Sequence, residues 1–498
     1  MNSKNDYLLG IDIGTGSIKV IAINKNGHIL RSIQNPYKIA NGVELDPEKI
    51  LEVFFDSIKQ IKKLEKGNLI SITLSSFMHG LMLIDKNNLP LTNIITWADN
   101  RSEIIASKLR INPRGQEIYK QTGTPIHAMS PLCKIIWFKV HKKDIFRNAY
   151  KLISIKEYLW FRIFNKYEID YSIASATGLF NTKELDWNND SLKIAGIKAA
   201  RLSTIVPCTF SRTYTGNDPY LSSLYNIPIC IGSSDGCMAN VGSYIKKPSQ
   251  AALTIGTSGA VRLTTSKAFH DFKSMMFDYV IDKNTHIIGG PVNNGGNVIL
   301  WMIKTFLKKD KPSAKDFDWY FSSIQKISVG SDGLIFLPYI YGERAPLWDE
   351  KASGAFIGIK DFHTTEHFLR AALEGICFAL CSILKYLPKA HLITDIHISG
   401  GFIKEPTYTQ MLADITGKKI KIVFKEDASA LGAAIFGKNA LGIKTSSKLV
   451  SPKVETFLPS KDSHNIYKEY FKIFKELYTP LKSSLHTLSS ISESKIPH

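Results

Sequence analysis

Several features that would classify a protein quickly are scarce or missing in this sequence of 498 residues. It has only six cysteines, with no C-x-x-C pair and no zinc-ligand spacing, so we expect reduced core cysteines and no zinc ribbon. No uncharged apolar run reaches 18 residues, which predicts a protein without membrane-spanning helices. The N-terminus also lacks the apolar stretch of a signal peptide, and we therefore expect a cytoplasmic protein.

Acidic residues are in short supply as well, since 44 Asp and Glu stand against 63 Lys and Arg. The lysines are scattered singly and in pairs, without a basic block that alternates with aromatic residues. We therefore interpret the net charge of +19 as background composition with modest attraction for anionic substrates, and we expect no nucleic-acid partner. The motif G-x-x-x-x-G-K-[ST] does not occur, which excludes phosphate binding of the P-loop type.

The most informative stretch that is present is 8–23, LLGIDIGTGSIKVIAI, an apolar strand that turns at Gly-Thr-Gly-Ser and returns as a second strand. Asp12 is its one acid. Gly14 and Gly16 allow close approach of a ligand, while Thr15 and Ser17 offer donors to an anion. Such a turn beside an acid suits a metal-bound phosphate, and an ordinary hairpin with a glycine-rich turn is the alternative.

The chain repeats this pattern about half its length later, in 252–264. There Ile255-Gly256-Thr257 stands where the first copy has Ile13-Gly14-Thr15, and Thr254 replaces Asp12. An internal repeat at this distance indicates a duplicated domain. Two facing phosphate hairpins, one acidic and one neutral, predict a nucleotide held in a cleft between two related domains.

Asp235 is the candidate catalytic base. It follows the apolar strand 227–231 and lies between small residues, in Gly-Ser-Ser-Asp-Gly at 232–236. Open α/β sheets bind ligands at the carboxyl ends of their strands. A hydroxyl that attacks a γ-phosphate needs a carboxylate to accept its proton. The alternative is an aspartate that only caps a helix.

Three further motifs carry weaker signals. Gly295-Gly296 and Gly400-Gly401 each precede a predicted helix, and the second pair would let an adenine or a ribose lie on the backbone. A plain helix-entry turn is the alternative for both pairs. The segment 363–367, HTTEH, fits an inverted zinc-protease pattern, but we interpret it as a helix start with Thr364 as N-cap.

Together these motifs resemble the FGGY family of carbohydrate kinases, in the actin-like, RNase H-like ATPase superfamily. Residues 12–15 resemble its first phosphate motif, 232–236 the segment of its catalytic aspartate, 254–259 its second phosphate motif and 399–402 its adenosine motif. The resemblance implies an α/β fold of two duplicated actin-like ATPase domains around a central cleft. It also implies ATP and Mg²⁺ as cofactors, with Asp12 meeting Mg²⁺ through water. The predicted phosphate- and ATP-binding set is Gly14, Thr15, Gly16, Ser17, Lys19, Gly256, Thr257, Gly295, Gly296, Gly400 and Gly401.

Within the family, the stretches 96–102, 123–132, 291–296 and 342–348 are similar to the gluconokinase members. The resemblance therefore implies phosphorylation of a sugar acid, D-gluconate, whose carboxylate needs a cation. Met78-His79-Gly80 is closer to the xylulokinase wording, and Ala128 stands where gluconokinases usually have proline, so xylulose or another polyol is the alternative. The predicted substrate set is Met78, His79, Asp99, Arg101, His127, Asp235 and Arg344, although any of its cations could instead form a structural ion pair.

We expect residues 1–246 to form the domain of the sugar, the Mg-phosphate hairpin and the catalytic base. Residues 247–498 are expected to form the ATP-binding domain, with a frayed tail from about 483. A homodimer is compatible with the sequence. A rival of another class is an actin-like nucleotide switch, which would leave the loops of 76–180 without a purpose.

Overall fold

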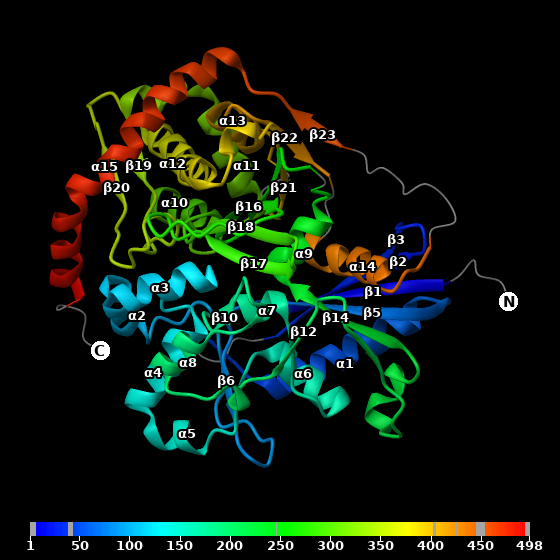
Figure 1. Ribbon diagram of the computed structural model, residues 1–498. Helices are drawn as coiled ribbons and strands as arrows, with labels where there is room; N and C mark the ends of the chain where they lie inside the picture. The colour runs from blue at the N-terminus through cyan, green and yellow to red at the C-terminus, as the bar shows by residue number, and fades with distance from the viewer. Residues whose placement is uncertain are drawn as a thin grey trace. The chain divides into compact units, whose positions relative to one another are not determined.

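The computed structural model describes residues 6–37, 43–245, 247–401, 405–423, 427–444 and 454–493 (Figure 1). The chain divides into two compact units. The first comprises Met1–Tyr244, Thr264–Ile288 and Glu426–Pro452, and the second comprises Ile245–Leu263, Gly289–Lys425 and Lys453–His498. A single boundary at residue 246, which itself lies outside the described residues, stays a prediction.

The first sheet has six strands in the order β13-β14-β5-β1-β2-β3. Strands β1, β2 and β3 form an antiparallel meander, and β5 and β14 extend the sheet with parallel pairings. The strands are β1 (Asp6–Ile13), β2 (Ser17–Asn24), β3 (Ile29–Pro36), β5 (Asn68–Ser76), β13 (Ser211–Thr213) and β14 (Pro228–Ser234).

Both faces of strand β1 are covered by other elements. Leu9 and Ile11 point into a core that also contains Phe54 of α1 (Pro47–Leu64) and Trp160 of α6 (Ile155–Phe164). Since side chains alternate along a strand, Gly10 faces the other way. A methyl group on Gly10 would lie 1.9 Å from the carbonyl oxygen of Ala430. The backbone around Ala430 therefore packs closely on the opposite face of β1.

The helix that makes this close approach is α14 (Ala428–Ala440), drawn in orange beside the blue strands in Figure 1. It also packs tightly on α9 (Asp235–Gly242), where a methyl group on Gly242 would meet the Ala428 carbonyl oxygen at 1.9 Å. The run of small residues in 428–436 allows this close packing.

The remaining elements before residue 225 frame the loops of 76–180. The helices are α2 (Glu103–Ile111), α3 (Pro113–Thr122), α4 (Pro131–His141), α5 (Lys143–Asn148), α7 (Tyr171–Ser175) and α8 (Asn189–Ala195), with 3₁₀ turns at Ala199–Arg201 and Pro219–Leu224. The short strands are β4 (Glu44–Leu45), β6 (Met82–Ile84), β7 (Ile94–Ile95), β8 (Lys151–Ile153), β9 (Glu168–Asp170), β10 (Phe180–Asn181), β11 (Asp186–Trp187) and β12 (Thr204–Val206).

The second sheet has seven strands in the order β17-β18-β16-β15-β21-β22-β23. They are β15 (Gln250–Ile255), β16 (Gly259–Thr265), β17 (Phe277–Asp282), β18 (Thr285–Val292), β21 (Asp395–Ser399), β22 (Lys419–Ile422) and β23 (Glu455–Phe457). The other elements of this half are α10 (Gly296–Leu307), α11 (Ala314–Ser323), β19 (Ile335–Leu337), β20 (Ala355–Ile357), α12 (Thr365–Tyr386), α13 (Pro406–Thr416) and α15 (Lys461–Glu493), with 3₁₀ turns at Ile324–Lys326, Ser331–Gly333 and Ala390–Leu392.

The two sheets repeat one topology, which confirms the predicted duplication. Strand β1 pairs antiparallel with β2 and parallel with β5, and strand β15 pairs in the same way with β16 and β21. Asp12 lies opposite Ser75 of its parallel neighbour, as Thr254 lies opposite Ser399. The fold is thus the expected two-part α/β architecture.

The C-terminal region corrects one expectation. Helix α15 runs to Glu493, so the predicted fraying from 483 is wrong over most of that stretch, and residues 494–498 lie outside the described part. The helix continues because Leu485 is buried and His486 Nε2 lies 2.9 Å from both carboxylate oxygens of Asp349. These contacts are distant in sequence and leave little periodicity to detect.

Among the described residues, one helix is long and apolar enough to cross a membrane, Thr365–Tyr386. Of its most apolar window, 94% is buried inside the protein, which is the environment of a core helix.

Candidate active site

The turn between β1 and β2 is tight and open to approach. The Gly14 N–H donates to the Ser17 carbonyl oxygen at 3.0 Å, and the Tyr37 hydroxyl donates to the Gly14 carbonyl oxygen. Ser17 is buried and accepts a hydrogen bond from Gln34. Gly16 is exposed, and a methyl group there would have no neighbour within 4 Å. The turn therefore has room for a ligand directly above its backbone.

Asp12 lies just before this turn and is only 4% exposed. The Ser75 hydroxyl donates to its Oδ1 at 2.7 Å. Burial, followed by the charges of Asp427 and Asp235, raises the pKa of Asp12 to about 8, against the opposing effect of Lys19. Three carboxylates thus act on one another around a single lysine, which is an environment that favours a bound cation.

Asp427 was missed in the sequence. Its side chain caps α14 by accepting from the Ala430 N–H at 2.9 Å, and it also accepts from Lys19 Nζ at 2.6 Å. The only local signal is an aspartate before a run of small helical residues, which is an ordinary N-cap pattern. Lys19 was predicted to bind phosphate, and that contact stays a prediction beside the observed ion pair with Asp427.

Asp235 is the first residue of α9, directly after the carboxyl end of β14. Ser234 provides the N-cap and accepts from the Cys237 N–H, so the explanation of Asp235 as a plain N-cap is wrong. The Asp235 carboxylate accepts from the Gly236 N–H at 2.6 Å. Because Ser233 pairs with Ser75 and Ser75 pairs with Asp12, the two carboxylates lie at the same edge of the sheet.

This edge fits a magnesium ion better than a transition metal. Among the described residues, no three His, Cys, Asp or Glu side chains converge as a ligand set. Mg²⁺ usually keeps several waters and is held by one or two carboxylates together with substrate phosphates. Asp12, with the Asp235 carboxylate at the same edge of the sheet, matches that requirement.

The second hairpin is assembled from three of the predicted motifs, all within the second unit. The Gly296 N–H donates to the Gly256 carbonyl oxygen at 2.9 Å, which ties the turn to the start of α10. A methyl group on Gly295 would make a tight contact, 3.0 Å from the Thr257 carbonyl oxygen. Gly400 has a φ of +111°, and a methyl group there would lie only 1.9 Å from the Ile255 carbonyl oxygen, while Gly401 beside it has open space. Phe402 of the adenosine motif lies outside the described residues.

His79 has both ring nitrogens engaged by the protein. Its Nδ1 donates to the Ala176 carbonyl oxygen at 2.7 Å, and its Nε2 lies 2.8 Å from the Tyr279 hydroxyl. The neighbouring Met78 packs against the cluster that contains Tyr279. The His79 ring is therefore fixed in place, and its predicted contact with substrate stays a prediction.

Arg101 forms ion pairs in the structure, and its predicted contact with substrate stays a prediction. Its Nε donates to Asp99 Oδ1 at 2.8 Å, and its Nη2 contacts both Asp99 and Glu44. The guanidinium also lies over the Trp137 ring, 5.1 Å from the ring centroid. These contacts use Nε and Nη2 and hold the group rigidly.

Lys134 was not predicted, yet it connects the substrate loops. It is fully buried in α4, and its Nζ donates to the carbonyl oxygens of His79 at 2.8 Å and Thr96 at 2.6 Å. Burial lowers its pKa to about 7, although Asp99 counteracts this effect. The lysine thus joins the loop of Met78-His79 to the loop of Asp99-Arg101.

The predicted substrate residues His127 and Arg344 form hydrogen bonds within different units. His127 is buried in the first unit, where its Nδ1 accepts from the Met129 N–H at 3.1 Å. Arg344 belongs to the second unit and donates from Nη2 to the Val292 carbonyl oxygen at 3.0 Å. Their contacts with a substrate stay predictions.

The HTTEH segment starts α12, with Thr364 as its N-cap as predicted. His367 Nδ1 accepts from the Thr364 N–H at 3.0 Å, and its Nε2 lies 3.2 Å from Asp332 Oδ2. These contacts explain the motif as helix capping.

Comparisons with known proteins agree with this geometry. The model of the N-terminal domain of the FGGY family of carbohydrate kinases matches residues 7–242, and that of the C-terminal domain matches 251–441. The gluconokinase of Bacillus subtilis is 38% identical over 99% of both chains, and a xylulose kinase of Staphylococcus epidermidis is 28% identical over 98% of this chain and 99% of its own. A gluconate kinase structure from Lactobacillus acidophilus has a TM-score of 0.88 at 31% identity and covers 97% of this chain and 99% of its own. The chain therefore belongs to the FGGY family of carbohydrate kinases.

Proposed function

We propose that this protein transfers the γ-phosphoryl group of ATP to the terminal hydroxyl of D-gluconate, giving 6-phospho-D-gluconate and ADP. The observation that carries the choice of substrate is the 38% identity to a gluconokinase over 99% of both chains. The curated xylulose kinases of Staphylococcus, Bacillus, Lactococcus and Escherichia are at most 28% identical.

In this reaction Asp235 is the general base. The substrate hydroxyl oxygen attacks the γ-phosphorus, the bond from that phosphorus to the ADP oxygen breaks, and the hydroxyl proton passes to the Asp235 carboxylate. A positioned base of this kind contributes roughly 10²–10⁴-fold to the rate. The position of Asp235 after a parallel strand and at the start of a helix supports this role.

Asp12 is the residue that would hold Mg²⁺, through water. The ion neutralises charge on the transferring phosphates when it is bound. The turn at 14–17, with Lys19, and the turn at 256–257 would bind the phosphates, while Gly295-Gly296 and Gly400-Gly401 would accommodate the nucleotide. Residues 1–246 would form the domain that binds the sugar and carries the base, and residues 247–498 the domain that binds ATP. The enzyme would be cytoplasmic.

Recognition of a sugar acid requires a donor for its carboxylate. Asp99 and Glu44 occupy Nε and Nη2 of Arg101, so we assign the contact with the sugar carboxylate to its remaining group, Nη1. A guanidinium fixed in this way loses little conformational freedom on binding. His127 is the second candidate in the same unit.

Xylulose is the second candidate substrate, and two observations favour it. The sequence Met78-His79-Gly80 is more similar to the corresponding motif of xylulokinases. A ligand-bound xylulose kinase structure from Lactobacillus acidophilus reaches a TM-score of 0.89 at 31% identity, the same identity as the gluconate kinase structure from that organism.

Turnover measured side by side on gluconate, xylulose and glycerol, with ADP release coupled to an optical signal, tests the proposal. We expect kcat/KM for gluconate to exceed the other two by about 10- to 100-fold, since one charge-assisted contact is worth about 1.5–3 kcal/mol. Higher kcat/KM on xylulose would replace gluconate as the substrate. ATP hydrolysis that is independent of any sugar and accompanied by polymer formation would instead favour the nucleotide-switch class.

The base is tested by Asp235→Asn, which keeps the size of the side chain and removes the proton acceptor. We expect turnover to fall by about 10³-fold with nearly unchanged ATP binding. Near-normal turnover would remove Asp235 from the proposed role.

A further inference from the structure

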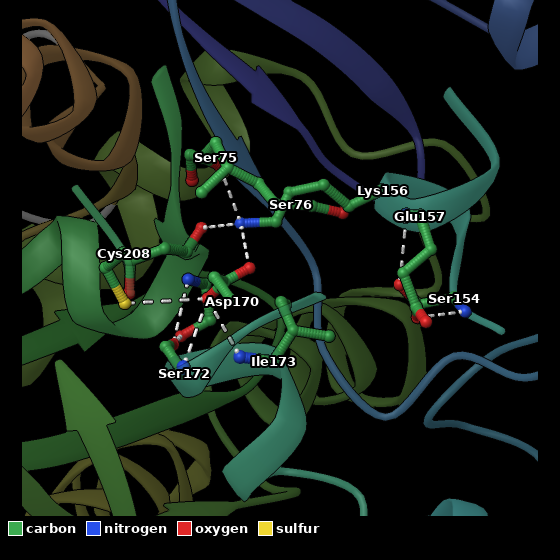
Figure 2. A network of polar contacts seen from close by, with 12 residues as sticks. Ser75, Ser76, Ser154, Lys156, Glu157, Asp170, Ser172, Ile173 and Cys208 are labelled. Carbon is green, nitrogen blue, oxygen red and sulfur yellow. Dashed lines mark hydrogen bonds and ion pairs between the residues drawn. The ribbon is translucent and has the colours of Figure 1, made fainter. Parts of the chain in front are cut away.

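Lys156 and Asp170 form a buried ion pair beneath the segment that carries Asp235. Lys156 is 2% exposed in α6, and Asp170 is fully buried at the end of β9. Lys156 Nζ lies 2.6 Å from Asp170 Oδ2. Figure 2 draws this ion pair as a dashed line. Desolvation offsets most of the attraction in such a pair, so its presence is weak evidence for a role in stability alone.

The remaining donors of Lys156 are directed at the backbone of β14. Nζ donates to the carbonyl oxygens of Ile231 and Ser233, both at 3.0 Å. Lys156 thus makes two hydrogen bonds to this backbone in addition to its ion pair with Asp170. The segment just before Asp235 is thus bound to a side chain from another helix.

This backbone is irregular at the point where Lys156 contacts it. Carbonyls two residues apart in a regular strand are about 6.6 Å apart, too far for both to lie 3.0 Å from one nitrogen. Gly232 lies between the two carbonyls with a φ of +65°, and the pairing of β14 with β5 shifts register there. A methyl group on Gly232 would lie 1.9 Å from the Leu74 carbonyl oxygen. The kink is therefore specific to glycine, and Lys156 satisfies the carbonyls on both sides of it.

Asp170 connects Lys156 to the start of α9 through hydrogen bonds with α7. Its Oδ1 accepts from the N–H groups of Ser172 and Ile173, both at 3.1 Å, and so caps α7 (Figure 2). The Ser172 Oγ then accepts from the Ser234 N–H at 3.0 Å and donates to the Ser234 Oγ at 2.6 Å. Ser234 is the N-cap of the helix whose first residue is Asp235.

We propose that Lys156 and Asp170 are positioning residues for Asp235, which they hold through the backbone of 231–234. The inference rests on the proposed function of Asp235 as the base. Changes to this pair should lower kcat more than they alter KM. The reason is that misplacing a reacting group by about 1 Å costs about 100-fold in rate. A pair that only stabilised the fold would not act through Asp235.

The main test uses the double variant Lys156→Met with Asp170→Asn. It removes both charges together, and the asparagine keeps an oxygen to cap α7. We expect kcat to fall by about 10–100-fold, with KM for ATP and for the sugar changed less than about threefold. Ser172→Ala, which removes no buried charge, should lower kcat by about fivefold and keeps the test decisive if the charge variants fold poorly.

The decisive measurement repeats these changes in the Asp235→Asn background, with phosphorylated sugar counted from labelled ATP. If the pair acts through the base, the double variant should lower the residual rate by less than about twofold there. An equal fall in both backgrounds, or a wild-type kcat for the double variant, would overturn the proposal. Near-normal turnover of Asp235→Asn alone would instead show that the proposed function has failed, and this inference with it.

Arg212→Met is the matched control. Arg212 donates from Nε to Glu168 Oε2 at 2.7 Å, so the change removes a cation that pairs with the same strand β9 but does not bind 231–234. We expect its kcat to stay within about twofold of the wild type.

Discussion

Replacement of Gly10 by alanine tests the packing on which the active-site edge depends. The new Cβ would lie 1.9 Å from the Ala430 carbonyl oxygen and 2.5 Å from the Ala434 nitrogen. Both atoms belong to the backbone of α14, so no side-chain rotation can relieve the contact. The helix would have to move by about an ångström or more from β1 to restore an ordinary contact distance.

The expected cost follows from two opposing effects. Overpacking a core costs about 1–3 kcal/mol, and a shift of a whole helix backbone belongs at the upper end of that range. The lower entropy of the unfolded alanine chain returns only about 0.4–1 kcal/mol. A net loss of about 2 kcal/mol should lower the Tm of Gly10→Ala by about 4–8 °C.

Thermal unfolding followed by circular dichroism measures this change, and Gly16→Ala in the same hairpin is the control. A methyl group on Gly16 meets nothing within 4 Å, so its Tm should stay within about 2 °C of the wild type. A wild-type Tm for Gly10→Ala, or an equal loss for both variants, would refute the close approach of α14 to β1.

Three other predictions follow from the contacts described. Burial lowers the pKa of His270, but its hydrogen bond to Asp278 and the charge of that residue outweigh burial and raise the pKa above its usual value. This contribution to stability is fully present below about pH 6.5 and is lost as the pH rises through the raised pKa. The Tm difference between wild type and His270→Gln should therefore shrink from pH 6 to pH 9, and a constant difference would contradict the assignment. Arg101→Ala should raise KM for gluconate by about tenfold or more but KM for glycerol by less than about threefold, whereas equal effects would argue against carboxylate recognition. All six cysteines are buried, so a thiol reagent should label the native protein slowly and the unfolded protein at all six positions.

Much of the fold could be predicted because its signals are local. The strand-turn-strand pattern at 8–23 and its repeat at 252–264 each form hairpins, and the apolar stretch from 366 became α12. A glycine turn, an alternating strand and a helical stripe are each determined by neighbours a few residues away. The duplication was visible for the same reason, since both copies keep the same local chemistry.

The partners of the site residues could not be predicted in the same way. Lys19 and Asp427 are 408 residues apart in sequence, and no local pattern marks them as an ion pair. The same holds for Arg101 with Glu44, and for Lys156 with the carbonyl oxygens around Gly232. Tertiary packing determines such pairs, because a charge that is removed from water needs a counter-charge or a carbonyl oxygen nearby, and packing sets which of these groups lies close to it.

The sequence by itself therefore determined which residues are candidates for binding phosphate and accepting a proton, because a glycine turn and an acid at a strand end are local patterns. Only the tertiary structure decided which carboxylates share one edge of the sheet and which cations are already paired. Those relations arise from strand register and helix packing between segments that are far apart in the chain.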